Sequence, residues 1–165
     1  MIPDVAGPAI ARVHADLREL FARIGELAPG VPAPRVTLDL PASEPEPLHV
    51  FAWGTARDFG IAGLLSGNVC RVTFHVWVTV VATASTPEDA ARIANAYQAV
   101  ALQVPLVDTQ LGGAVEEIGA PQVKEADAWG DADGRRHAGY LLDFEAAVHV
   151  SASPEARDII EEMTL

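Results

Sequence analysis

The segment from Val69 to Thr83 constrains the fold of this chain more than any other part of the sequence. It is rich in Val, Thr, Phe and Trp, the residue types that favour strands. Successive side chains of a strand point to opposite faces of the sheet. Here an apolar set of side chains alternates with a set that is polar or bulky. The apolar set is Val72, Phe74, Val76, Val78 and Val80, and the other set is Arg71, Thr73, His75, Trp77 and Thr79. The segment therefore predicts a strand that crosses a whole sheet, with one face in a core and Trp77 on the other, where it is a candidate for protein contact.

Two amphipathic helices are predicted to cover the apolar face of this strand. Between Pro8 and Leu27 the apolar residues recur at intervals of three and four, which lines one face of a helix. A second helix begins at Thr86, where Thr can cap, Pro87 suits the first turn and two acids follow. We expect it to run to about Gln103 and to end before Pro105.

Short strands and loops are predicted between the first helix and the long strand. Strands are expected at Arg35–Leu40 and Leu48–Trp53, joined by the proline-rich segment 41–47 as an exposed extended loop. The segment from Gly54 to Asn68 contains four glycines, and we expect an irregular or mobile connection there.

The C-terminal third predicts a long β-hairpin. One strand is expected from about Gly113 to Trp129, with a break near 119–121, and a return strand from Arg135 to Val150. Asp-Gly between two strand-like runs is a strong hairpin signal, and it occurs here at positions 131–134. A short acidic helix opens at Ser153-Pro154.

These elements predict a single α+β domain over residues 1–165, with a core at 8–150 and an acidic C-terminal extension at 151–165. The expected architecture is a mostly antiparallel β-sheet with two long α-helices packed on one face, a long β-hairpin and a short C-terminal helix. A chain of 165 residues can bury a sufficient core without disulfides or a metal.

Charge and composition exclude several classes of partner. The chain has 11 basic and 23 acidic residues, a net charge of -12, which repels double-stranded DNA and anionic lipid. We expect no membrane association, because the longest apolar run is too short to span a bilayer, and no secretory signal. The single cysteine, Cys70, favours a reducing compartment.

No catalytic, cofactor-binding or metal-ligating residues are predicted. The five histidines are scattered, without the short spacing of zinc ligands. Aligning Gly134 with the glycine of a calcium loop puts Trp129 and Tyr140 where acids are required. Cys70 lies at the start of an apolar strand, where burial is the simpler interpretation. We therefore expect a protein that is not an enzyme.

Three segments together resemble the tail terminator, or tail completion, proteins of long-tailed bacteriophages, which are minor tail proteins. They are "VTFHVWVTVVATASTPEDAARIANAYQAVALQVPL", "VDTQLGGAVEEIG" and "EADAWGDADGRRHAGYLLDFEAAVHV". The proline-rich segment with its flanking strands, 31–53, is similar too, so that the resemblance covers about residues 8–150. The Gly54–Asn68 connection and the extension after Pro154 depart from the pattern.

The resemblance implies a structural protein of the virion. Such proteins form a hexameric ring on the head-proximal end of the tail tube, end tube polymerisation and present a surface for head–tail joining. The implied partners are further copies of the chain, the tail tube protein and a head–tail connector or neck protein, while DNA passes through without specific binding. Assembly would take place in the host cytoplasm.

Two alternatives to the tail terminator remain open. The first is a head-closure or neck connector protein of the same fold, which would bind the portal side and not the tube. The second is a small cytoplasmic ligand-binding or enzymatic α+β domain that uses the glycine-rich segment 54–67.

The hairpin and the long strand supply the candidate contacts between subunits or with the tube. A closed ring needs two different patches on each subunit, and arginines beside acids make the hairpin turn complementary to another copy. An ordinary solvated hairpin is the alternative. The candidate interface residues are Trp77, Trp129, Asp131, Asp133, Gly134, Arg135 and Arg136.

Overall fold

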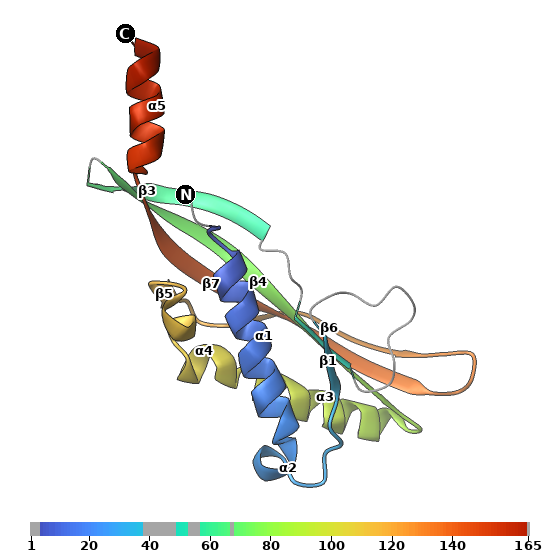
Figure 1. Ribbon diagram of the computed structural model, residues 1–165. Coiled ribbons are helices and arrows are strands. Elements are labelled where there is room, and N and C mark those ends of the chain that lie inside the picture. Colours follow the sequence, from blue (N-terminus) through green and yellow to red (C-terminus); the bar gives the residue numbers. More distant parts are fainter. Residues whose placement is uncertain (1–3, 38–48, 53–56, 67, 165) are drawn as a thin grey trace.

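The computed structural model describes residues 4–37, 49–52, 57–66 and 68–164 (Figure 1). The fold is α+β, with helices packed on one face of a seven-stranded sheet. In chain order the elements are α1 (Gly7–Ala22), α2 (Ile24–Leu27), β1 (Arg35–Thr37), β2 (His49–Ala52), β3 (Arg57–Ser66), β4 (Val69–Ala84), α3 (Pro87–Ala101), α4 (Gln103–Val107), the 3-10 turn η1 (Leu111–Gly113), β5 (Glu117–Ile118), β6 (Gln122–Gly130), β7 (Arg136–Ser151) and α5 (Pro154–Thr164).

Two strands of 16 residues, β4 and β7, form the centre of the sheet. They are antiparallel and pair along their whole length, from Val69 opposite Ser151 to Ala84 opposite Arg136. Strands β2 and β3 both pair with β4, and β5 and β6 both pair with β7. Among the strand pairs of the described residues, the pairing of β1 with β2 alone is parallel. The predictions of a mostly antiparallel sheet and of a long hairpin, β6–β7, are confirmed.

The core lies between this sheet and the helices α1 and α3. The predicted apolar side of β4 faces it, since Phe74, Val76, Val78 and Val80 are fully buried. From the helices, Phe21 and Tyr97 meet edge to face with ring centroids 5.5 Å apart. The Tyr97 hydroxyl donates to the Pro32 carbonyl oxygen at 2.6 Å, and burial raises the pKa of Tyr97. These contacts hold both helices on one face, and no helix of the described residues packs on the other face of the sheet (Figure 1).

The start of α3 follows its sequence signals closely. The Thr86 hydroxyl accepts a hydrogen bond from the Asp89 amide at 3.2 Å, as a capping residue does. The end of the helix differs from the prediction, because α3 stops at Ala101 and a separate helix, α4, contains Pro105. Pro105 lies in the first turn of α4, where its missing N–H would have no partner within the helix.

The first predicted helix is divided in two. Arg23 leaves the helical conformation (φ -110°, ψ 23°), which separates α1 from α2. Its guanidinium pairs with Glu26, with nitrogen–oxygen distances of 2.7 and 3.1 Å. The sequence periodicity continues across this break, because both helices use the same apolar side.

The glycine-rich segment after Gly54 is not the irregular connection we expected. Residues 57–66 form strand β3, which pairs with the first half of β4 in three steps separated by register shifts. Pairing with the long strand β4 overrides the low strand preference of glycine, and the register shifts interrupt the regular pairing at three places. The proline-rich segment 41–47 lies outside the described residues.

A second difference lies at Gly112-Gly113. The strand predicted from about Gly113 begins only at Glu117, and residues 111–113 form a 3-10 turn. Leu111, Gly112 and Gly113 have φ of 47°, 65° and 90°, a left-handed conformation that glycine adopts without strain. Of the described helices, none is long and apolar enough to span a membrane.

Candidate interaction site on the helix-free face

The candidate site is formed by side chains of β4, β6 and β7 that point away from the helices, a surface that we call the helix-free face. Trp77 lies opposite Asp143, Val81 opposite Gly139, and Thr83 opposite His137 across β4 and β7. On the outer side of β7, strand β6 places its own residues opposite the same positions. The alternation of the strands thus brings residues far apart in sequence onto one surface.

A hollow of about 320 Å³ opens between the two tryptophans of this face. We call it the tryptophan hollow. Val81, Leu141 and Gly139 are among its apolar lining residues, and Glu125 and Asp127 bring carboxylates to it. A Cβ atom at position 139 would lie 2.9 Å from the Val80 carbonyl oxygen, so a larger residue there would require the backbone of β4 to shift. The predicted candidates Trp77 and Trp129 therefore belong to the same hollow.

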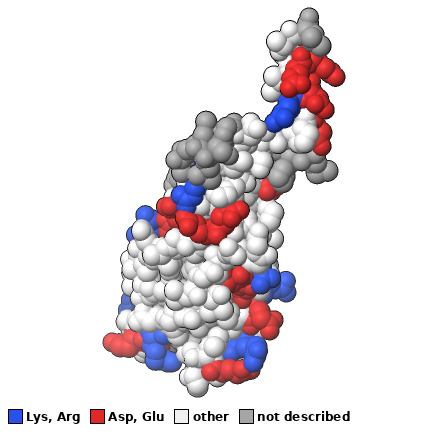
Figure 2. All heavy atoms as spheres, turned by 90° about the vertical axis from the view of Figure 1, so that its left-hand side faces the viewer, with Lys and Arg blue, Asp and Glu red and all other residues white. Residues whose placement is uncertain are grey.

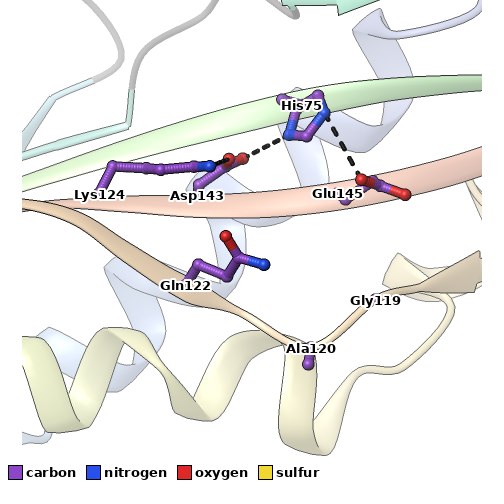
Figure 3. Close-up of a pocket in the computed structure, with 7 residues that line it drawn as sticks. All are labelled: His75, Gly119, Ala120, Gln122, Lys124, Asp143 and Glu145. Carbon is purple, nitrogen blue, oxygen red and sulfur yellow. Dashed lines mark hydrogen bonds and ion pairs between the residues drawn. The ribbon is translucent and has the colours of Figure 1, made fainter. Parts of the chain in front are cut away.

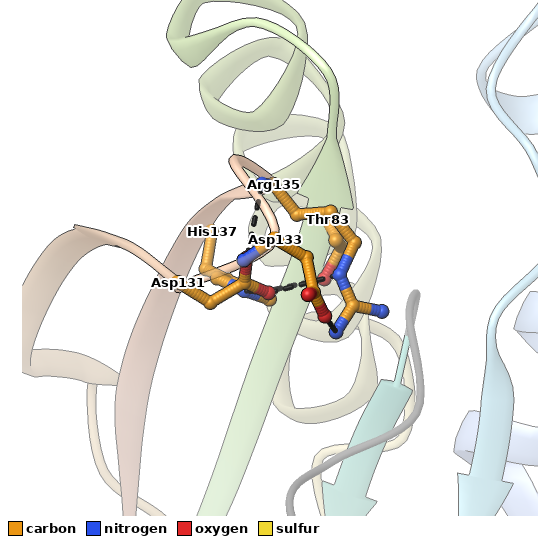
Figure 4. A network of polar contacts seen from close by, with 5 residues as sticks. All are labelled: Thr83, Asp131, Asp133, Arg135 and His137. Carbon is orange, nitrogen blue, oxygen red and sulfur yellow. Dashed lines mark hydrogen bonds and ion pairs between the residues drawn. The ribbon is translucent and has the colours of Figure 1, made fainter.

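Trp129 is held as a rigid platform by His137. The two rings are stacked, with centroids 5.1 Å apart and planes inclined by 14°. The His137 ring is itself fixed at both nitrogens, by Thr83 Oγ1 at 2.8 Å from Nδ1 and by Asp131 Oδ2 at 2.9 Å from Nε2 (Figure 4). Trp129 remains 41% exposed, so a partner could contact its ring. Because the ring is already held in place, little side-chain entropy would be lost in that contact.

The hairpin tip, residues 131–135, is organised around Asp131. Its Oδ1 accepts from the amides of Asp133 and Arg135, both at 3.0 Å, and its Oδ2 accepts from Arg135 Nε at 2.9 Å. The hydrogen bond from His137, aided by those from Arg135 and Asp133, lowers the pKa of Asp131 to about 2. Gly134 completes the turn with φ 78°. The tip charges are thus largely balanced within one chain.

A second, polar hollow of about 290 Å³ lies farther along the same face (Figure 3). At its base is Asp143, whose oxygens contact His75 Nδ1 at 2.7 Å and Lys124 Nζ at 3.5 Å. His75 Nε2 is 3.6 Å from Glu145 Oε2. Asp143 is only 4% exposed, and a buried carboxylate requires such partners. This cluster stabilises the sheet at the point where β6 is bulged beside Lys124.

A carboxylate pair lies away from this face, between α1 and the segment after α4. Arg12 Nε is 2.7 Å from Asp108 Oδ2 and 3.2 Å from Asp16 Oδ1. Burial, a hydrogen bond with Asp108 and the Asp108 charge raise the pKa of Asp16 to about 6. The hydrogen bonds from Asp16, Arg12 and the Gly112 amide lower the pKa of Asp108 to about 2. The contacts of Arg12 with Asp16 and Asp108 thus connect α1 with the end of α4.

Among the described residues, no three His, Cys, Asp or Glu side chains are placed to hold one metal ion. The glycine-rich loop of the enzyme alternative is, over residues 57–66, a paired strand.

The structure places the residues that the sequence analysis named as follows. Trp77 lies on the predicted face, and of the tip residues Asp131, Asp133 and Arg135 contact one another, while the Arg136 guanidinium lies against Gly130. The sequence did not indicate Glu125, Asp127 and Gly139, or the buried Asp143. Alternation along β7 groups residues 139, 141 and 143 on one face, but the pairing of β7 with β4 and β6 is needed to place them, Glu125 and Asp127 beside Trp77.

No protein-family model and no curated protein matches this chain. Among solved structures the chain is similar to one from the "Virion of native gene transfer agent (GTA) particle". The likeness covers 87% of this chain and 97% of that chain, with 14% sequence identity and a TM-score of 0.43. Identity and TM-score this low do not assign a function.

Proposed function

We propose that this protein is a structural subunit of a phage-like virion, which closes the head-proximal end of a tail tube as a hexameric ring. In this role it ends tube polymerisation and offers the surface for head–tail joining, with DNA passing through without specific binding. The sequence resemblance given above suggests the role, and three features of the subunit support it.

The C-terminal helix carries the proposal. None of its eleven residues is buried, and it projects away from the sheet (Figure 1). An isolated helix of this length is marginal in water, yet Ile159, Ile160 and Met163 are 60%, 63% and 82% exposed. Spacings of three and four residues put these side chains on one side of the helix. Such a helix is completed by a partner, as expected for a subunit of an assembly.

The helix-free face and the edge of the sheet add two further contact regions. All nine residues of β6 are exposed, and its one strand partner among the described residues is β7. An open edge strand can pair with another chain. The helix-free face, the β6 edge and α5 differ from one another, as head-to-tail contacts around a ring require.

The distribution of charge fits a channel for DNA. Residues 108–133 contain seven acids and one lysine, and residues 155–162 contain four acids and one arginine. Figure 2 shows acidic side chains along the projecting helix. Acids near a lumen would keep the duplex from adhering, because adhesion depends on basic side chains that displace counterions.

Mass measurement of the full chain in solution, alone and with tail tubes, tests the proposal. We expect a species of about six times the subunit mass of 17.4 kDa, and a ring at one end of each tube by electron microscopy. A chain that ends after Ser153 should keep its fold and lose or weaken this assembly. A monomer at all concentrations that ignores tubes would contradict the proposal.

The head-closure alternative predicts a different partner. A neck protein of the same fold would bind the portal ring and leave tubes unbound, so binding assays with both particles separate the two roles. In either role, Arg135→Glu combined with Arg136→Glu tests whether the hairpin tip is at the contact. Unchanged binding would place the interface elsewhere on the subunit.

A further inference from the structure

The tryptophan hollow places two carboxylates beside two tryptophan rings. Glu125 and Asp127 line it, and among the described residues that do so there is no Lys, Arg or His. Within the described part of the chain, neither carboxylate belongs to an ion pair; Asp127 Oδ1 accepts only from the neighbouring Ala128 amide, at 2.8 Å. Among the described side chains of the hollow, the two carboxylates thus have no cationic partner.

This combination determines the chemistry of a ligand. Faces of tryptophan rings attract cations, and guanidinium most often. A guanidinium is planar, so it can stack on a ring and at the same time donate paired hydrogen bonds to a carboxylate. The apolar base of the hollow, which includes Val81 and Leu141, suits the aliphatic part of the same side chain.

We propose that the tryptophan hollow binds an arginine side chain of a partner protein, flanked by apolar residues. The inference names the partner group for a surface proposed above as an interface, and it rests on that proposal. The guanidinium stacks on Trp129, whose ring is fixed by His137, and pairs with Glu125 or Asp127. A second copy docking with this same acidic face is disfavoured, because like charges would meet. An anionic partner such as DNA is disfavoured for the same reason.

The structure explains why such a site would be selective. Trp129 is stacked on one side by His137, which is held by Thr83 and Asp131, so that little side-chain entropy is lost when a ligand arrives. Lysine would keep the charge but lose the stacked plane and the paired hydrogen bonds. Arginine should therefore bind more tightly than lysine, and both more tightly than an uncharged isostere.

The test uses the full ¹⁵N-labelled chain and the blocked tripeptide acetyl-Leu-Arg-Leu-amide. Binding is followed by the indole N–H resonances of Trp77 and Trp129. We expect saturable shifts with a dissociation constant below about 10 mM, the weak range for one side chain. The matched peptide with citrulline, which keeps the shape and lacks the charge, should bind at least about tenfold more weakly, since charge-assisted contacts are lost.

Two sets of variants locate the site. Glu125→Gln with Asp127→Asn should weaken binding about tenfold, as expected for two partly exposed ion pairs. Glu145→Gln is the matched control, because Glu145 lies on the same face but lines the other hollow, and it should leave binding unchanged. Trp129→Phe keeps a ring and should bind more weakly than the parent, because tryptophan attracts cations best.

Three outcomes would overturn the inference. The first is that neither indole resonance shifts at peptide concentrations up to about 10 mM. The second is that the citrulline peptide binds as tightly as the arginine peptide. The third is that the Glu125→Gln, Asp127→Asn variant binds the arginine peptide as tightly as the parent. Ring formation is read separately from the mass in solution. A ring that ignores the peptide contradicts the inference alone, whereas a monomer that binds the peptide contradicts the ring alone.

Discussion

The two faces of the central strands β4 and β7 differ although their residues alternate along the same two strands. On one face Phe74, Val78 and Phe144 are completely buried beneath α1 and α3. On the other, Trp77, Asp143 and Trp129 surround two hollows. The helix-covered face is completed within one chain and accounts for stability. On the helix-free face, stacking and ion pairs hold the side chains in place, and we propose that a partner molecule covers this face.

This difference separates residues that maintain the fold from residues that recognise a partner. Burial of apolar area stabilises a side chain's own subunit, whereas an exposed aromatic ring on a rigid support contributes mainly when a second molecule covers it. Substitutions on the two faces should therefore affect different measurements, as the following predictions specify in order of decreasing effect.

The largest effect is expected on the helix-covered face. Phe144 has no exposed surface, and Phe144→Ala should lower the free energy of unfolding by about 3–5 kcal/mol, through lost burial and the cavity left behind. Trp129→Ala is the matched substitution on the other face and should cost less than half as much. Chemical denaturation measures both. Equal losses would mean that the helix-free face belongs to the core.

The next effect concerns Asp143, the one carboxylate of the helix-free face that is buried among the described residues. Asp143→Ala leaves His75 and Lys124 without their common partner, and should lower the free energy of unfolding by about 1–2 kcal/mol. Glu145 is more than half exposed, and Glu145→Ala should change stability by less than about 0.5 kcal/mol. If both variants behave alike in denaturation, the Asp143 cluster does not stabilise the sheet.

A pH-dependent effect is expected from Asp16. Its pKa is raised to about 6 in the folded chain, chiefly by burial, so its contribution to stability is present below about pH 4 and is lost as the pH rises through 6. Asp16→Asn imitates the protonated acid. The variant should match the parent at pH 4 and be more stable at pH 8, by on the order of 1 kcal/mol. Parallel stability curves from pH 4 to 8 would contradict this interpretation.

The smallest change in global stability, and a clear local one, is expected at the hairpin tip. The lowered pKa of Asp131, about 2, means that its contribution is present above about pH 4 and is lost as the pH falls through 2. Trp129 fluorescence should change in that interval, because protonation releases His137. Asp131→Asn should show the altered fluorescence already at pH 7. An unchanged spectrum would show that His137 and Trp129 are held without Asp131.

Local sequence signals predicted much of the fold. The alternation of β4, the cap at Thr86 and the Asp-Gly turn each depend on residues close in sequence, and the structure confirms the strand, the helix start and the hairpin. Strand β3 was missed because its pairing with β4 is a long-range contact that its glycines do not announce. Helix α4, which contains Pro105, was missed because a short break after α3 starts a new helix, and proline is allowed in the first turn of a helix.

The sequence by itself determined that this chain has a two-sided sheet with Trp77 on the side opposite the helices, because alternation is a property of the strand alone. Only the tertiary structure decided that Trp129, 52 positions later in the numbering, reaches the same hollow as Trp77. It also decided that Gly139, Glu125 and Asp127 line this hollow. Those relations depend on the register between β4, β7 and β6, which long-range pairing sets and no local pattern encodes.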